Sequence, residues 1–398
     1  MRSFCVGKRL KHRSYPHRVR PRERVARAMQ RAVPDRVPLY EMHIPPKIAA
    51  VILGRDPGQV MLHNPEAFFR LAAEGRADLD KVNRRVAEEL VSLYTKLEID
   101  WIRVVGAYTR VPREVKRLGE REWLVDGRLL VWSGETLWDP QMLWDAATAP
   151  DPDELLRYCR SAKPEVDPRA FDVLREVVKR VKGEYFVSFD ADGTWGPIVS
   201  SPPLLRRVLV WVYKRPDVVE ALIDYYTRIA IAYGEYAIDE GADAIQLCVD
   251  YGNKNGPWLS PQMFRRFVKP ALVRHVNAFK RKGAFVVLHS DGNIAPLLPD
   301  IVDAGVDAYQ GIDVMAGMSL AEVKRRYGDK LCLVGNVDPR VIEFGAPEDV
   351  EREVDRCLRE GGREGFVLSA SANISANTNA RNFIHMIEYA KRKGVFSR

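Results

Sequence analysis

The chain has 398 residues, of which 46% are hydrophobic and 29% charged. This composition excludes collagen-like, disulfide-stapled and wholly disordered proteins, and the length suffices for one large α/β domain or two ordinary ones. No apolar run reaches the roughly eighteen residues that a membrane span needs, the N-terminus lacks an apolar signal core, and the five cysteines are scattered. These features predict a cytoplasmic protein without a membrane anchor.

The formal net charge of +8 is concentrated at the N-terminus. Residues 1–22 hold eight lysines and arginines and no acidic residue. Such an arm can contact nucleic acid or an anionic surface, but no zinc-finger or other nucleic-acid signature accompanies it. We therefore predict a disordered leader, or an overlong start of the reading frame, over residues 1–22, one folded domain over residues 23–398, and no nucleic-acid partner.

Eight short apolar runs alternate with amphipathic helical patterns along the rest of the chain. Several runs are continuously apolar, which is typical of parallel strands buried on both faces. The predicted strands are Val37–Met42, Trp101–Val105, Tyr185–Phe189, Ala244–Val249, Ala284–Leu288, Asp307–Gln310, Leu331–Val334 and Gly365–Leu368. The helical patterns between them include Pro216–Glu240, Ser260–Lys282, Leu320–Tyr327 and Pro347–Glu360. Eight βα units predict a (β/α)₈ TIM barrel; a doubly wound sheet ranks second, because no Gly-x-Gly-x-x-Gly turn follows the first strand.

The alternation is interrupted between the second and third predicted strands. Residues Glu122–Trp132 have apolar flanks around Asp126-Gly127, a pair that favours the tight turn of a β-hairpin. We predict a hairpin excursion over one end of the barrel at this point.

Polar residues follow most of the predicted strands. Because the C-terminal ends of barrel strands meet at one face, these residues predict an active-site cleft there. The candidate substrate-binding residues are His43, Lys47, Asp190, Asp192, Trp195, Tyr251, Asn336, Asp338 and Asn373. For a single residue such as Asp313, the role of helix cap is the better interpretation. Trp195 and Trp258 fit an apolar wall for a flat ligand as well as they fit simple packing of the loops.

His289-Ser290-Asp291 is the sharpest local element. A histidine and a carboxylate two residues apart at a strand end can both face the cleft, as metal ligands or as an acid–base pair. The structural alternative is a histidine bonded to a neighbouring loop, with Asp291 capping the next helix. We take His289, Asp291 and Asp250 as the candidate catalytic residues, and His63, His275 and His385 as structural. Cys248 and Cys332 lie among apolar neighbours and are interpreted as core residues.

Five segments together carry a family resemblance. They are Pro34–Pro38, Gly241–Ala244, Leu259–Pro261 with Phe264 and Pro270, His289–Ile294, and Gly335–Pro339. In this order and spacing the chain, from about residue 22 onward, resembles the uroporphyrinogen decarboxylase superfamily. That superfamily also holds methyltransferases that move a methyl group from a corrinoid to a thiol. The resemblance implies a (β/α)₈ barrel with its active site in the predicted cleft.

The chain departs from the decarboxylase pattern at three positions. The resemblance would place Arg-Gln-Ala-Gly-Arg-Tyr after the first strand, where this chain has His43–Ile48, so both carboxylate-gripping arginines are replaced. The catalytic aspartate after the second strand corresponds to Ala107, and the late histidine to Ala372. A substrate with eight carboxylates needs a dense cationic grip, so these departures argue against porphyrin decarboxylation.

The methyltransferase pattern is retained in part. In that branch a His-x-Cys and a second cysteine hold zinc, which activates the acceptor thiol. Here His289 is kept, Asp291 replaces the first cysteine and Ala372 the second, so a third ligand such as Asp250 or Asp192 is needed. We predict a methyltransferase-like enzyme with zinc at His289 and Asp291, whose methylcorrinoid donor is carried by a partner protein. The sequence leaves open whether the protein forms a homo-oligomer.

Two alternatives stay open at this point. One is cofactor-free decarboxylation of uroporphyrinogen or a smaller carboxylate, with His43 and Lys47 as the binding cations. The other is a non-catalytic protein that binds a tetrapyrrole or corrinoid.

Overall fold

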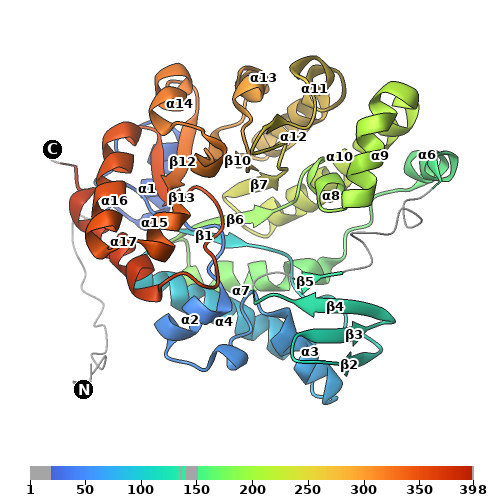
Figure 1. Ribbon diagram of the computed structural model, residues 1–398, viewed down its shortest axis with the longest axis horizontal. Coiled ribbons are helices and arrows are strands. Elements are labelled where there is room, and N and C mark those ends of the chain that lie inside the picture. Colours follow the sequence, from blue (N-terminus) through green and yellow to red (C-terminus); the bar gives the residue numbers. More distant parts are fainter. Residues whose placement is uncertain (1–18, 135–136, 140–150, 397–398) are drawn as a thin grey trace.

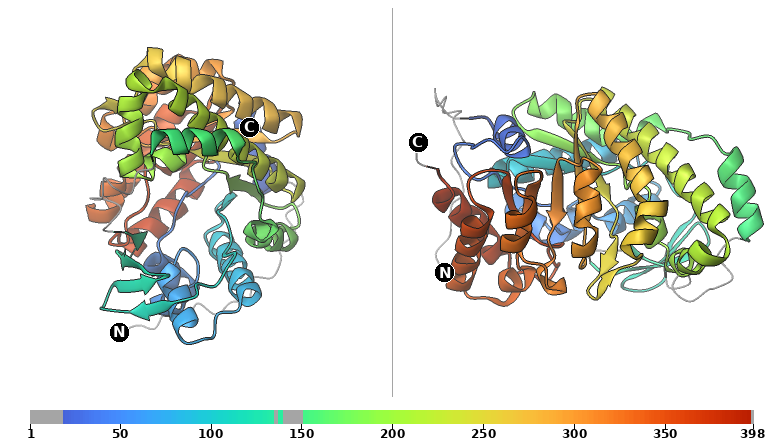
Figure 2. Two further views of the ribbon diagram at one scale, coloured as in Figure 1. Left: turned by 90° about the vertical axis from the view of Figure 1, so that its right-hand side faces the viewer. Right: turned by 90° about the horizontal axis from the view of Figure 1, so that it is seen from above.

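A computed structural model describes residues 19–134, 137–139 and 151–396. Its centre is a curled parallel sheet of seven strands in the order β1-β6-β7-β10-β11-β12-β13. The strands are β1 (Trp101–Val104), β6 (Phe186–Asp190), β7 (Ala244–Cys248), β10 (Phe285–Ser290), β11 (Ala308–Gly311), β12 (Cys332–Val337) and β13 (Phe366–Ala370). Helices surround these strands (Figures 1 and 2). Seven of the eight predicted strands are thus confirmed, and the fold is mixed α/β and TIM-like.

The closing segment, Val37–Met42, completes the ring between β13 and β1. Leu39 forms a parallel bridge with Leu368 of β13, and Tyr40 forms one with Trp101 of β1. The prediction of a full strand over Val37–Met42 was wrong, because only isolated bridges form there. Pro38 has no N–H to donate, and its carbonyl accepts from the Leu368 N–H at 2.9 Å.

A buried ion network holds this closing segment. Asp100, fully buried, accepts from Arg24 Nη1 at 2.5 Å, from Arg36 Nη1 at 2.8 Å and from the Leu39 N–H at 2.9 Å. These bonds tie helix α1 (Pro21–Met29) and the closing segment to the start of β1. The predicted arm over residues 1–22 overlaps α1 at its last two residues, and its residues 1–18 lie outside the described part. The division into an arm and one folded domain stays a prediction.

Apolar side chains fill the barrel at its N-terminal end. Val25, Ala28 and Met29 of α1 pack with one inward-facing layer of the strands, so α1 closes that end. The strand residues of this layer are Trp101, Phe186, Ala244, Val287, Ala308, Cys332, Val334 and Val367, joined by Tyr40 and Met42. Polar chemistry is therefore left to the opposite, C-terminal end, and the prediction that Cys332 is a core residue is confirmed.

A small antiparallel sheet stands between β1 and β6 in the chain. It has the order β2 (Val115–Arg117), β3 (Glu122–Val125), β4 (Arg128–Trp132) and β5 (Leu137–Trp138). Strands β3 and β4 pair antiparallel around Asp126 and Gly127, which both have positive φ. The Trp123 ring lies 5.9 Å from that of Phe69 on helix α3 (Pro65–Ala73), so the sheet packs on α3 (Figure 1).

The outer helices follow the predicted alternation, with one break. The pattern over Ser260–Lys282 is divided into α11 (Pro261–Phe267) and α12 (Lys269–Arg281), because Pro270 has no N–H for a continuous helix. None of the helices in the described part of the chain combines the length and apolar character that a bilayer crossing requires. The other helices and short elements are α2 (Pro46–Leu53), η1 (Pro57–Gln59), α4 (Leu79–Leu97), α6 (Pro152–Ser161), η3 (Pro168–Phe171), α7 (Asp172–Val181), α8 (Gly196–Val199), α9 (Pro202–Lys214), α10 (Pro216–Asp239), β8 (Gly252–Asn253), β9 (Gly256–Pro257), η4 (Ala295–Leu297), α13 (Leu298–Asp303), η5 (Val314–Ala316), α14 (Leu320–Tyr327), α15 (Pro339–Phe344), α16 (Pro347–Gly361) and α17 (Ala380–Lys393).

Candidate active site

Asp250, His289 and Asp291 meet at the C-terminal end of the barrel. His289 is the fifth residue of β10, Asp291 directly follows that strand, and Asp250 follows the neighbouring β7. His289 Nε2 lies 3.4 Å from Asp250 Oδ1 and 3.9 Å from Asp291 Oδ1. One ligand atom from each residue lies within 4.8 Å of the others, which suits a shared cation. The structure thus brings together the three predicted catalytic residues.

Gln310 of β11 orients the histidine. Its Oε1 accepts a short hydrogen bond from His289 Nδ1, across the register pair that joins β10 and β11. With one proton held on Nδ1, Nε2 faces the two carboxylates and could bind a cation in place of its own proton, which is the arrangement of metal-binding histidines with an outer hydrogen-bond partner. Asp250 is fixed in turn, because its Oδ1 accepts from the Asp291 N–H at 2.9 Å.

The charges of the cluster depend on one another. Burial alone would lower the pKa of His289, but the Asp291 and Asp250 carboxylates outweigh it and raise that pKa to about 9. Burial raises the pKa of Asp291 to about 6. Burial opposes the ionisation of Asp250 also, but its hydrogen bond to His289 holds its pKa below the usual range. Without a metal, the protein therefore favours a protonated His289 between the two carboxylates. A metal cation could take the place of the Nε2 proton.

A second polar cluster lies beside the first. Arg103 of β1 forms a short ion pair with Asp190 at the end of β6, and its Nη2 lies 3.5 Å from Cys248 Sγ. The Cys248 thiol donates to Asp190 Oδ2 at 3.1 Å, and burial raises its pKa well above the usual value. Cys248 is thus half-buried among polar partners, not a purely apolar core residue, and it stays a protonated thiol.

Asp192 stands at the edge of this cluster in a strained backbone conformation. Its φ is +56°, in the left-handed region, and its N–H donates to Asp190 Oδ1 at 2.9 Å. Burial and the neighbouring Asp190 raise the pKa of Asp192 to about 6. Asp192 is therefore a carboxylate that can gain or lose a proton near neutral pH.

Two pockets open at this end of the barrel. One, of about 320 Å³, is lined by Arg103 and by the residues around His43 and His63. The other, of about 300 Å³, is lined by Asp190 and Asp192 with Tyr226 and other apolar residues of α10. Gly106 lines both pockets, so they adjoin.

Other predicted site residues have structural contacts. Trp195 is buried at 1% exposure, and Tyr251 is buried with its ring edge-on to Phe264 at 5.0 Å, so both pack the loops. Asp338 caps α15 and pairs with Arg340 at 2.6 Å. Asn336 is buried and donates to the Ile312 carbonyl at 3.1 Å.

Of the two residues predicted as binding cations, His43 lines the pocket beside Arg103, and Lys47 lines neither of the two pockets. Lys47 is exposed on α2, and burial holds the pKa of His43 well below its usual value, so His43 is neutral. Asn373 is exposed in the loop after β13. The cap predicted for Asp313 is confirmed, because its side chain accepts from the Met315 and Ala316 N–H groups.

Sequence reasoning missed Arg103 and Gln310. Arg103 interrupts the apolar run of one predicted strand, and Gln310 is the polar last residue of another. In a strand buried on both faces such a polar side chain is a signal for an inward-facing functional group, and it could have identified both residues.

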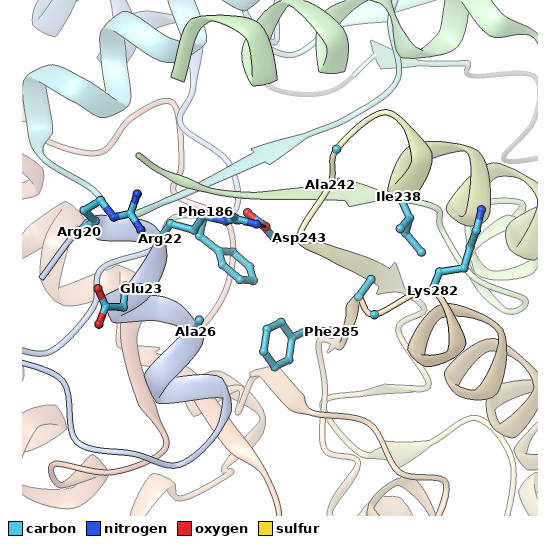
Figure 3. A pocket seen from close by; sticks show the side chains of 13 residues that line it. Arg20, Arg22, Glu23, Ala26, Phe186, Ile238, Ala242, Asp243, Lys282 and Phe285 are labelled. Atoms are coloured by element: carbon cyan, nitrogen blue, oxygen red, sulfur yellow. Dashed lines mark hydrogen bonds and ion pairs between the residues drawn. The ribbon is translucent and has the colours of Figure 1, made fainter. Parts of the chain in front are cut away.

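A third pocket, of about 480 Å³, lies at the opposite end of the barrel (Figure 3). Its rim holds Arg22, whose guanidinium pairs with Asp243 at 2.7 Å, and Lys282, which bonds Asp239 at 2.5 Å. Phe186 and Phe285 form its inner wall, with ring centroids 6.0 Å apart. The charged groups named here are already paired, so we place the functional site at the C-terminal end.

The fold and the clustered histidine and carboxylates define a TIM-like α/β protein with an enzyme-type site at its strand ends. Residues 201–393 match the family model for uroporphyrinogen decarboxylase. The chain is 26% identical over 191 residues to uroporphyrinogen decarboxylase from Chlorobium phaeobacteroides, covering 46% of this chain and 52% of that protein. It is 30% identical over 182 residues to the Geobacter sulfurreducens enzyme, covering 46% and 51%. The resemblance to the uroporphyrinogen decarboxylase superfamily is thereby confirmed.

The chain spans about half the length of the curated relatives it matches. A solved methyltransferase from Methanosarcina mazei has a TM-score of 0.63 at 18% identity, covering 94% of this chain and 98% of that one. This likeness supports the fold over nearly the whole chain. The superfamily holds enzymes, both decarboxylases and methyltransferases, so the particular activity has to be argued from the site.

Proposed function

We propose that this protein is a metal-dependent methyltransferase that moves a methyl group from a corrinoid on a partner protein to a thiol or similar acceptor. The observation that carries the proposal is the convergence of Asp250, His289 and Asp291 within 4.8 Å. His289 occupies the position at which the methyltransferase branch places its zinc-binding histidine, and the two carboxylates supply ligands in place of cysteines.

The residues present fit a divalent cation. Asp291 Oδ1 is buried without a hydrogen bond among the described residues, and the His289 Nε2 lone pair is directed by Gln310. Asp250, His289 and Asp291 would hold the cation as two oxygen ligands and one nitrogen ligand, a set that zinc accepts. When bound, the cation would lower the pKa of an acceptor thiol and so favour the thiolate.

We assign the acceptor's proton to Asp192. Burial, the Asp190 charge and, to a smaller extent, the Asp250 charge raise the pKa of Asp192 to about 6, so its carboxylate can take a proton near neutral pH. As the methyl carbon bonds to the acceptor atom, its bond to the donor breaks with the electron pair left on the donor, and the proton from the acceptor atom passes to an Asp192 oxygen. Arg103 and Asp190 hold Asp192 in place through the bond from its N–H to Asp190 Oδ1.

This assignment predicts a pH dependence. The turnover rate should rise with pH up to about 6 and level off above it, because Asp192, with its pKa raised to about 6, must be ionised to accept a proton. Asp192→Asn should lower the rate by roughly 10²–10⁴-fold and remove that inflection. Steady-state rates between pH 5 and 8 for both proteins test this. An unchanged inflection in Asp192→Asn would assign it to another group.

Decarboxylation is the second candidate, favoured by the similarity of residues 201–393 to the decarboxylase family. The mouth of this barrel is rich in carboxylates, with Asp190, Asp192, Asp250 and Asp291, and the guanidinium of Arg103 is already paired with Asp190. A substrate with many carboxylates would be repelled there. Release of carbon dioxide from a small carboxylate by metal-free protein would support this candidate.

The proposal is tested with methylcobalamin as the donor and a panel of thiols as acceptors. The rate of methyl transfer is measured from the loss of the methylcobalamin absorbance. Wild-type protein should accelerate demethylation. Chelation, or Asp250→Asn, should lower the rate by roughly 100-fold or more, since a Lewis acid contributes several kcal/mol. Equal rates in wild-type, chelated and variant protein would refute a metal-dependent transfer. His385→Ala, which alters a histidine paired with Glu351 on the helical shell, is the matched control.

A further inference from the structure

The pocket of about 320 Å³ beside Arg103 has walls of aromatic and aliphatic side chains. It lies between the ends of the closing segment and β1, the loop after α2, helix α4 and strand β4. Its lining includes the aromatic and imidazole rings of His43, His63, Tyr108 and Trp132 and the aliphatic side chains of Val86 and Leu90. Its volume is near the lower bound of small-molecule sites, which suits one ring and its substituents.

The rings in these walls are uncharged. The imidazoles of His43 and His63 are stacked, with centroids 4.4 Å apart and planes inclined by 25°. Burial lowers the pKa of His63 to about 4 and that of His43 well below its usual value, so neither carries a proton at neutral pH. Tyr108 stacks on Phe68 at 4.0 Å, and burial raises its pKa above the usual range. The walls therefore offer flat, neutral π surfaces.

Arg103 supplies the polar contact of the pocket. Its Nη1 donates to the Met42 carbonyl at 3.0 Å and its Nη2 to Asp190 and Cys248. Its Nε–H is buried and has no hydrogen-bond partner among the described residues. Met42, Asp190 and Cys248 thus account for three of the five guanidinium N–H groups, while the positive charge is offset by Asp190. A ligand in this pocket can accept a hydrogen bond from Arg103. A negative charge on the ligand would add little attraction, because Asp190 already neutralises the guanidinium.

We propose that this pocket binds an uncharged planar ring compound with one hydrogen-bond acceptor, which receives an N–H of the Arg103 guanidinium. The identity of this compound rests on the proposed function: the ring is the part of the methyl acceptor that carries its reacting atom. Arg103 connects the pocket to the site, because it bonds Cys248 and Asp190 and lies within electrostatic range of His289. A planar aromatic ring can stack on the flat side chains of the walls, whereas a saturated ring has no π face to stack, and an anion meets the carboxylates of the mouth.

The test measures binding by calorimetry to protein stripped of metal, with benzamide as the probe. We expect benzamide to bind, cyclohexanecarboxamide to bind roughly tenfold more weakly because it is not planar, and benzoate to bind more weakly because it is charged. Equal binding of the saturated amide would overturn the assignment of a planar ligand. Tighter binding of benzoate would overturn the assignment of an uncharged one.

Two matched substitutions locate the probe. Val86→Phe fills the pocket beside Arg103 and should abolish binding, whereas Ala230→Leu fills the adjoining pocket and should leave binding unchanged. Tyr108→Leu, which removes a flat wall, should weaken binding and is the second variant if Val86→Phe does not fold. The reverse pattern would place the probe in the other pocket and refute the inference. Because binding is measured on metal-free protein, benzamide binding there together with no methyl transfer by the metal-loaded protein would refute the proposed function alone.

Discussion

Purified protein is expected to carry about one divalent cation per chain, and His289→Ala to lose it. His289 provides the nitrogen ligand of the Asp250–His289–Asp291 cluster. Its removal leaves two half-buried carboxylates whose repulsion is relieved by protonation, not by a cation. The metal content of both proteins, measured by inductively coupled plasma mass spectrometry after gel filtration, checks this result.

Two further variants test whether the cation is bound at the Asp250–His289–Asp291 cluster. His385→Ala should keep the cation, because His385 pairs with Glu351 away from the cluster. Gln310→Leu should bind cobalt(II) roughly 10–100-fold more weakly, since the imidazole loses the partner that fixes its proton on Nδ1. Equal metal content in wild type and His289→Ala would remove the metal from the mechanism.

Asp100→Ala is expected to lower the free energy of unfolding by about 3–5 kcal/mol. Asp100 is fully buried between Arg24 and Arg36, which are themselves nearly buried. Without the carboxylate, two guanidinium groups stay buried beside each other, and the Leu39 N–H loses its acceptor. The segment that closes the barrel between β13 and β1 would lose its anchor. Urea unfolding followed by circular dichroism measures the change.

An exposed aspartate is the control for this stability measurement. Asp80→Ala removes a carboxylate that is 71% exposed and lies 3.4 Å from Arg169, and should change the free energy of unfolding by less than about 0.5 kcal/mol. If Asp100→Ala were as mild as Asp80→Ala, the closing segment would be held by its backbone bridges and not by the ion network.

Sequence patterns predicted the sheet well where each strand is a local apolar run. Val286–Leu288 and Leu331–Val334 are examples, because burial on both faces requires continuous hydrophobic residues. The pattern failed over Val37–Met42, where the residues are apolar but Pro38 limits pairing to isolated bridges. Whether an apolar run forms a full strand depends on its backbone N–H groups, and the hydrophobicity of the run does not indicate these.

The candidate site was predicted as far as single strands allow. His289 and Asp291 are two residues apart, so the sequence itself brings them to one strand end. The approach of Asp250 depends on the register between β7 and β10, and the partner of His289 is a glutamine on β11. These contacts join residues that are far apart in the chain, so no local pattern indicates them.

The sequence by itself determined the alternation of strands and helices, the superfamily resemblance and the retained histidine. Each of these follows from local periodicity or from motifs a few residues long. Only the tertiary structure decided that His43 is neutral, that Arg103 is the guanidinium at the mouth, and that its charge is offset by Asp190. Charge and hydrogen bonding in a barrel are set by burial and by neighbours across strands, and both arise only when the chain closes on itself.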